Sequence, residues 1–346
     1  MKLRNYLLLS VCCCSSLMAQ EESIQDEKKV NLTYEVRGSY QRTYVDGKAQ
    51  KNESGFKGDV MNIIIRGKLS PKFSYNYRQR LSGINKDKSF FDATDWVYLD
   101  YKATENIILS AGKHIVYVGG WDFEPAPIDV FQLSEFCYNF PCYEWGGTVS
   151  YVTNSANDKV TMQVCESPFR KAYTNTSGKD ADMYAYNLIW FGKHGFFEPL
   201  WSVNMMEYAP GKFINYISLG SKFHINNRIQ LDFDYMNRAV SGQTFLFRDC
   251  SVMCKLAYQP ITELNLFTKF SYDVNKSGSN ANICVTDGTE ITSIGAGVEY
   301  YPLKKKNVRV HSTYNYSFGT NTNPNGVLKD KHSTFDVGLT WRAKIL

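Results

Sequence analysis

Most of the chain alternates apolar and polar residues with a period of two. The first such stretch interleaves apolar Val30, Leu32, Tyr34 and Val36 with polar Asn31, Thr33, Glu35 and Arg37. Successive side chains of a strand point to opposite faces of the sheet, so this pattern predicts strands with one apolar and one polar face. The pattern recurs along the whole chain and predicts an all-β fold with about sixteen strands.

The connectors between these strands alternate in length. The short ones are predicted at 70–71, 103–106, 153–158, 192–196, 224–227, 259–262 and 302–307. The long ones include 44–54, 82–91, 113–144, 167–182, 273–289 and 318–331. A transmembrane antiparallel β-barrel has short periplasmic turns and long outer loops, whereas a soluble sandwich or propeller has no such asymmetry. The connectors therefore favour the barrel.

The composition supports a barrel that spans a membrane. Tyr, Phe and Trp number 24, 21 and 6, or 15% of the chain, yet the mean hydropathy is −0.35. Aromatic girdles lie at both membrane interfaces of such barrels, while alternate residues face water. Beyond the N-terminus no apolar run reaches the 18 residues that indicate a membrane helix. We expect residues 29–346 to form an outer-membrane β-barrel whose outer face contacts lipid.

The N-terminus predicts export. Residues 1–19 begin with Lys2 and Arg4, continue with an apolar run and end at Ala19, which is the pattern of a cleaved signal peptide. Residues 20–28 are polar and predict a mobile periplasmic lead. Removal of the signal lowers the formal net charge from +5 to +3, which is too small to indicate nucleic-acid binding. The predicted location is the outer membrane of a Gram-negative envelope.

The third long connector, residues 113–144, is too long for a turn and rich in aromatic residues. Its aromatic residues are Trp121, Phe123, Phe131, Phe136, Tyr138, Phe140 and Tyr143, and its carboxylates include Asp122, Glu124, Asp129 and Glu135. We expect this loop to fold into the barrel and to narrow it, with water near its carboxylates. Cys137 and Cys142 lie within it, and an exported chain can oxidise such a pair. The sequence leaves their redox state open.

The inward residues predict the chemistry of the lumen. The basic candidates are Arg37, Arg66, Arg78, Arg80, Lys113, Lys255, Lys269 and Arg309; the acidic ones are Asp122, Glu124, Asp129, Glu135, Asp232, Asp234 and Glu299. A sixteen-strand barrel is wide enough to hold water, and rings of charge and pore width set selectivity. These charges either select solutes or merely solvate the lumen.

Two functions follow from this lumen. The first is a porin through which small hydrophilic solutes, ions or anions diffuse passively. The second is a non-conducting barrel, plugged by the aromatic loop, that binds or presents an envelope glycan or a partner protein. Five scattered histidines without an HExxH or GxSxG motif give no catalytic constellation. We therefore expect no enzymatic activity, cofactor or metal.

Several local motifs resemble the phosphate-selective porin O and P family of outer-membrane proteins. They are Phe56-Lys57-Gly58-Asp59, Arg66-Gly67-Lys68-Leu69, Gly112-Lys113 and Tyr117-Val118-Gly119-Gly120. The resemblance implies a sixteen-stranded barrel with an inward third outer loop, and a homotrimer. It also implies a pore lined by a ladder of arginine and lysine. The inner loop here is acidic and has Lys113 as its only internal cation, so phosphate selectivity does not follow.

Overall fold

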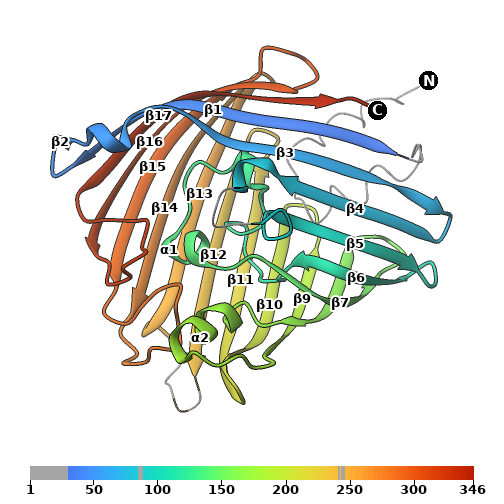
Figure 1. Ribbon diagram of the computed structural model, residues 1–346. Helices are drawn as coiled ribbons and strands as arrows, with labels where there is room; N and C mark the ends of the chain where they lie inside the picture. The colour runs from blue at the N-terminus through green and yellow to red at the C-terminus, as the bar shows by residue number, and fades with distance from the viewer. Residues whose placement is uncertain (1–29, 85–88, 241, 243–245) are drawn as a thin grey trace, which may run out of the picture.

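A single antiparallel sheet curls until its last strand pairs with its first (Figure 1). The computed structural model describes residues 30–84, 89–240, 242 and 246–346. β1 pairs with β3 on one side and with β17 on the other, which closes the sheet into a sixteen-strand barrel, with the two-residue strand β2 as an extra. Closure leaves no edge strand, so the backbone hydrogen bonds are satisfied within the sheet, as a membrane requires.

The strands have the following bounds. They are β1 (Asn31–Val45), β2 (Lys48–Ala49), β3 (Gly55–Ser70), β4 (Phe73–Arg80), β5 (Thr94–Lys102), β6 (Ile107–Ile115), β7 (Tyr143–Val152), β8 (Asp158–Glu166), β9 (Tyr184–Gly192), β10 (Phe197–Ala209), β11 (Lys212–Asn226), β12 (Ile229–Val240), β13 (Asp249–Ile261), β14 (Leu264–Asn275), β15 (Glu290–Tyr300), β16 (Val308–Thr320) and β17 (His332–Lys344). The short helices are η2 (Lys51–Glu53), η3 (Leu81–Gly83), η4 (Pro127–Asp129), α1 (Glu135–Asn139) and α2 (Arg170–Ser177).

The period of two in the sequence separates an outer from an inner face. On β8 the side chains of Val160, Met162 and Val164 are exposed, Met162 by 64%, whereas Thr161 and Gln163 between them are buried. The exposed apolar side chains of neighbouring strands share the outer face because paired residues project to the same side of a sheet. Val149, for example, lies opposite Met162. A continuous apolar outer surface of this kind suits lipid.

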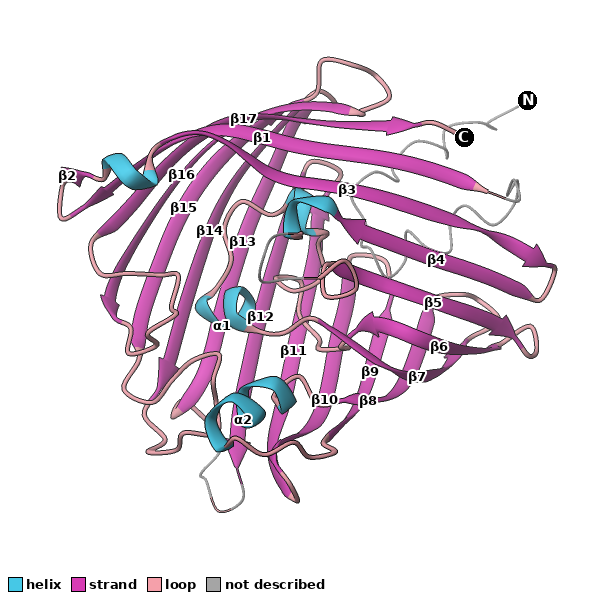
Figure 2. Cartoon of the chain, viewed as in Figure 1, coloured by secondary structure: helices cyan, strands magenta, loops and turns pink. Residues whose placement is uncertain are grey.

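The connectors also follow the prediction. Tight turns join β3 to β4, β11 to β12 and β13 to β14 at one rim, while α1, α2 and the long loops lie toward the other (Figure 2). The predicted signal peptide, 1–19, and lead, 20–28, fall outside the described residues. Among the described residues, no helix is long and apolar enough to cross a membrane.

Candidate functional site: the inner segment and its cavity

Residues 116–142, here called the inner segment, connect β6 to β7 and lie inside the barrel (Figure 1). Their backbone is hydrogen-bonded to polar side chains on the inner faces of successive strands. Asn204 on β10 donates to the Tyr117 carbonyl (2.6 Å), and Ser218 on β11 donates to the Gly119 carbonyl (2.7 Å). We call the inner faces of β8, β10, β11, β12, β14 and β15 the anchoring wall. The wall satisfies the backbone groups that a non-strand segment would otherwise leave unpaired.

Glycines let the backbone of the inner segment touch the anchoring wall. A Cβ on Gly119 would lie 2.6 Å from the carbonyl oxygen of Leu200. A Cβ on Gly220 of β11 would lie 2.7 Å from the Cα of Gly120, whose φ is +113°. Any larger side chain at Gly119 or Gly220 would push the two backbones apart, since such contacts are far below van der Waals distance.

Buried charges fix the middle of the inner segment. The two carboxylate oxygens of Asp234 on β12 accept from the amides of Trp121 (2.9 Å) and Asp122 (2.7 Å). Lys269 on β14 forms an ion pair with Asp122 and donates to the Gln132 carbonyl (2.6 Å). Burial raises the pKa of Asp122, but the attraction of Lys269 and its hydrogen bonds outweigh burial, and the pKa lies below its usual value. Asp122 is therefore a buried anion.

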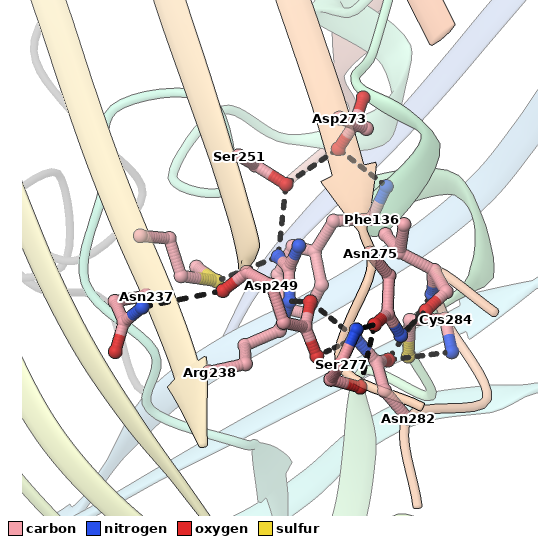
Figure 3. Close-up of polar contacts among 12 residues, drawn as sticks. Phe136, Asn237, Arg238, Asp249, Ser251, Asp273, Asn275, Ser277, Asn282 and Cys284 are labelled. Carbon is pink, nitrogen blue, oxygen red and sulfur yellow. Dashed lines mark hydrogen bonds and ion pairs between the residues drawn. The ribbon is translucent and has the colours of Figure 1, made fainter. Parts of the chain in front are cut away.

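A second network holds α1 against β13 and β14 (Figure 3). Asp273 accepts from the backbone amides of Glu135 (2.9 Å) and Phe136 (3.3 Å) and from the hydroxyl of Ser251. Next to it, Arg238 donates to Asp249 (2.7 Å), which also accepts from Asn282 in the outer loop 276–289. Phe136 packs in an apolar cluster with Phe140, Phe169 and Tyr216. Polar and apolar contacts together make this side of the barrel a packed core.

The far end of the inner segment is fixed by arginines from β16, β17 and β1. Asp129 accepts from Arg309 (2.8 Å) and from Arg342 (2.6 Å), and Arg37 donates to the carbonyls of Ile128 (2.9 Å) and Val130 (2.6 Å). Burial raises the pKa of Asp129, but Arg342 and Arg309 lower it further, so its pKa falls below the usual value. The inner segment is thus held along its whole length.

A cavity of about 860 Å³ remains beside the inner segment. It is bordered by residues of β1, β3, β4, β5, β16 and β17, by the inner segment itself, and by the outer loop 321–331. Among the described residues none from β8 to β15 borders it. We call the inner faces of β1, β3, β4 and β5 the cavity wall. The interior therefore has a packed half and a hollow half.

Two arginines on the cavity wall share one carboxylate. Arg78 Nε and Arg80 Nη2 lie 2.7 and 3.1 Å from the oxygens of Asp95. The guanidinium carbon of Arg78 lies 3.6 Å from the ring centre of Trp96 and 5.5 Å from that of Tyr143. Arg78 is 1% exposed, whereas the Arg80 side chain is 31% exposed. Stacking and the ion pair hold Arg78 rigidly, and Arg80 is the member that meets solvent.

The inner segment turns a mostly apolar surface toward the cavity. Phe123, Pro125, Val130 and Leu133 border the cavity and are half-buried, and Tyr138 on α1 is 37% exposed. Asp122 and Glu124 also border the cavity but are almost fully buried, and Asp129 binds arginines of the barrel wall. This differs from the expectation of carboxylates near water, because the backbone and charges of the segment are used to attach it.

The predicted basic residues have three kinds of position. Arg37, Arg78 and Arg80 border the cavity, while Lys269 and Arg309 bind the inner segment. Arg66 on β3 and Lys255 on β13 are half-buried and do not border the cavity; Lys255 lies over the ring of Phe267. Lys113 lies opposite Trp145, which is exposed on the outer face, and donates to the Phe91 carbonyl (3.3 Å). Its register therefore puts Lys113 outside the cavity.

The predicted acidic residues are mostly structural partners. Asp122 and Glu124 border the cavity but are almost fully buried. Glu135 is fully buried and accepts from the Leu328 amide (2.9 Å) in the outer loop 321–331. Asp234 binds the segment from β12, and Asp129, within the segment, binds Arg309 and Arg342. The remaining two lie on the wall, where Glu299 pairs with Arg309 (2.9 Å) and Asp232 accepts from Gln230 (2.8 Å).

Cys137 and Cys142 are free thiols in the structure. Cys137 is buried in the apolar cluster and Cys142 packs against it, together with Cys165 and Cys284. Burial raises the pKa of the Cys142 thiol to about 12. These thiols are protonated at neutral pH and act as small apolar side chains.

Sequence reasoning missed the partners of the arginines. Asp95 and Trp96 lie on β5, where the pattern of residues does not show which side chains face inward. In the structure Trp96 and Tyr98 face inward, with Tyr98 stacked on His114 at 3.9 Å, whereas Tyr101 packs on Phe73 at the outer face. Aromatic residues on both faces hide the period of two. A register shift between Arg78 and Gln79 brings both Asp95 and Trp96 to Arg78, so alternation alone would have put Asp95 on the other face.

Comparisons with known proteins agree with this architecture. The family model of phosphate-selective porin O and P matches residues 30–248. The sequence has no match among curated proteins. Among solved structures, the chain is similar to an anion-selective porin from Comamonas acidovorans (TM-score 0.64, 8% identity, 91% of this chain and 99% of that one). It is also similar to the outer-membrane OmpT of Vibrio cholerae (TM-score 0.61, 11% identity, 92% of this chain and 100% of that one). A third similar structure is the outer-membrane channel DcaP of Acinetobacter baumannii (TM-score 0.60, 11% identity, 91% of this chain and 97% of that one). Because these sequence identities are low, the structural similarity shows the fold alone.

Proposed function

The chain belongs to the phosphate-selective porin O and P family, and from this premise we infer that solutes cross its barrel through the hollow half, between the cavity wall and the inner segment. The protein is an outer-membrane porin that allows passive diffusion of small hydrophilic solutes or ions. The observation that carries the inferred route is the distribution of the cavity, which borders β1, β3, β4 and β5 but not β8 to β15.

The arginine pair on this route favours small anions locally. Arg78 and Arg80 carry two positive charges against the single charge of Asp95, and Lys57 beside Asp59 is well exposed. Charged side chains at a constriction select among ions. The lining set that we propose is therefore Arg37, Lys57, Arg78 and Arg80. The similar Comamonas acidovorans porin is described as anion-selective, which is in line with this proposal.

We also propose that the protein acts as a transporter without catalysis and that it assembles as a homotrimer. The OmpT structure of Vibrio cholerae includes a trimer form. Chemical cross-linking of the detergent-purified barrel would show a species of three chains. A monomer at every cross-linker concentration would contradict the assembly.

The route is tested by measuring single-channel current across a planar bilayer for two variants. One variant carries a bulky residue on the inner face of a strand, and the other carries it on the outer face of the same strand. Thr313 on β16 borders the cavity, and its neighbour Ser312 pairs with Val298 and Val337 on the outer face. Thr313→Trp should reduce the conductance by about half or more, because pore width limits conduction. Ser312→Trp, in lipid, should leave it unchanged.

Three results would contradict the proposal. Equal conductance of the two variants would place the route elsewhere. A folded barrel, recognised by a heat-dependent gel shift, that passes no current would support the plugged barrel instead. A reversal potential of cation sign in a salt gradient would contradict the anion preference.

A further inference from the structure

We propose that the cavity beside the inner segment binds small carboxylates that carry an aromatic or branched apolar body. This inference rests on the proposed route and names the solute class that the route would favour. It combines two surfaces that border the same cavity, one cationic at Arg80 and one apolar on the inner segment. Neither surface alone would select such solutes.

The cationic surface has one unmatched positive charge among the described residues. Arg78 and Arg80 share Asp95, and Arg78 is enclosed by Trp96 and Tyr143. Arg80 is the exposed member, and its guanidinium carbon lies 5.9 Å from the ring centre of Tyr143. A carboxylate at Arg80 would gain a charge-assisted hydrogen bond beside an aromatic ring.

Most of the other carboxylates around the cavity lie beside a cation; of the rest, Asp92 accepts from Ser89 and Glu124 is almost fully buried. Asp59 lies 3.0 Å from Lys57 and 3.4 Å from Arg37. Asp336 lies 4.0 Å from Lys57, and Asp122 is paired with Lys269. Glu53, near the mouth, lies 3.3 Å from Lys329. The negative charges of these paired carboxylates are balanced by nearby cations. The excess positive charge at Arg80 is therefore the feature that would attract a small anion.

The apolar surface is broad enough to take part in binding. Tyr138, Phe123, Pro125 and Leu133 of the inner segment all border the cavity, and Tyr138 is the most exposed of the segment's large apolar side chains. The segment is held along its length by the anchoring wall and by Arg37, Arg309 and Arg342, so this surface is preorganised and a solute need not order it. Water displaced from it by an apolar body would favour binding roughly in proportion to the area covered.

The two surfaces together predict a ranking of solutes. An aromatic carboxylate uses both surfaces, a small hydrophilic carboxylate uses only Arg80, and a neutral aromatic alcohol uses only the apolar surface. The cavity volume of about 860 Å³ is within the range of small-molecule sites, so a one-ring acid fits with water around it. Phosphate has no apolar body and would resemble the hydrophilic carboxylate.

The experiment measures how four probes reduce the single-channel current of the full mature chain in potassium chloride. The probes are phenylacetate, acetate, 2-phenylethanol and 2-phenylethylammonium, and a protein-free bilayer gives the baseline for each. Phenylacetate should bind about tenfold more tightly than acetate, a factor that corresponds to about 1.4 kcal/mol. The alcohol and the ammonium ion should bind more weakly than phenylacetate.

Variants separate the two surfaces. Arg80→Gln should weaken phenylacetate block about fivefold or more, since the charge-assisted contact is lost, while Lys304→Gln, at the exposed turn 301–307, should leave it unchanged. Tyr138→Ser should weaken the block about threefold through loss of apolar contact, and Tyr138→Phe should retain it.

The outcomes distinguish this inference from the proposed function. The inference is overturned if all four probes reduce the current equally, or if phenylacetate blocks the Arg80→Gln variant as tightly as the wild type. Either result leaves the porin function intact. Tighter block by the ammonium probe than by phenylacetate also overturns it. Absence of current in potassium chloride alone contradicts the proposed route before any probe is added.

Discussion

The two halves of the barrel interior are made from similar residue types but use them differently. On the anchoring wall, Asp234, Lys269 and Asp273 bind the backbone and side chains of the inner segment. On the cavity wall, Arg80 and Lys57 remain well exposed beside their carboxylate partners. The comparison teaches that an inward charge in a barrel is not by itself a pore-lining charge. What decides its role is whether a loop covers it.

The difference also explains where stability and selectivity reside. A buried charge that loses its partner carries a large desolvation cost, whereas a half-exposed one is screened by water. Substitutions on the anchoring wall should therefore loosen the inner segment and widen the pore. Substitutions on the cavity wall should change the selection of ions with little effect on the folded barrel.

The largest effect is expected from Lys269→Met. The substitution leaves Asp122 buried beside Asp234 without its cation, which costs about 3 kcal/mol. The inner segment should detach, so the single-channel current should become larger and noisier and the heat-dependent gel shift should occur at lower temperature. Lys255→Met, directly opposite in the β13–β14 register, is the matched control. Equal behaviour of the two variants would show that the ion pair does not hold the segment.

A somewhat smaller effect is expected from Gly220→Ala. The new Cβ would meet the Cα of Gly120 at 2.7 Å, and overpacking of this kind costs about 1–3 kcal/mol. The displaced segment should alter the conductance. Gly58→Ala, where a Cβ has nothing within 4 Å, should have no such effect. Wild-type conductance and stability in Gly220→Ala would argue against the close contact between the two backbones.

Acid should loosen the inner segment in a graded way. The pKa values of Asp122 and Asp129 lie below the ordinary 3.8, so their ion pairs contribute fully above that pH. This contribution is lost as the pH falls through the lowered pKa values, because the carboxylates must then be protonated. Loss of these two ion pairs should therefore add current noise below about pH 3.8, and the added noise should reverse on return to neutral pH. A rise between pH 7 and 5 would assign the change to other groups.

The smallest effect on stability is expected from Arg80→Gln. Arg80 is partly exposed, and Asp95 retains Arg78 after the change, so the stability should change by less than about 1 kcal/mol. The reversal potential in a salt gradient should nevertheless shift toward cations. A large fall in stability without that shift would make Arg80 a structural residue like Lys269.

The barrel could be predicted from the sequence because its signals are local. The period of two, the alternation of short and long connectors and the position of residues 113–144 depend only on neighbouring residues. Strand number and the inward position of Arg78, Arg80, Lys269 and Arg309 follow from them. Lys113 was misplaced, because it has the same parity as Ile107 and Leu109 and lies opposite Trp145 on the outer face.

The pairing of charges was decided only by the tertiary structure. Lys269 meets Asp122 across 147 positions of sequence, and Arg342 meets Asp129 across 213. No local pattern encodes such contacts, because they depend on the path of a loop that crosses the barrel. The chain alone thus determined a membrane barrel with a charged interior and a long third loop. The course of that loop determined which charges are buried as anchors and which face the solute, since burial converts a carboxylate from a pore-lining group into a structural one.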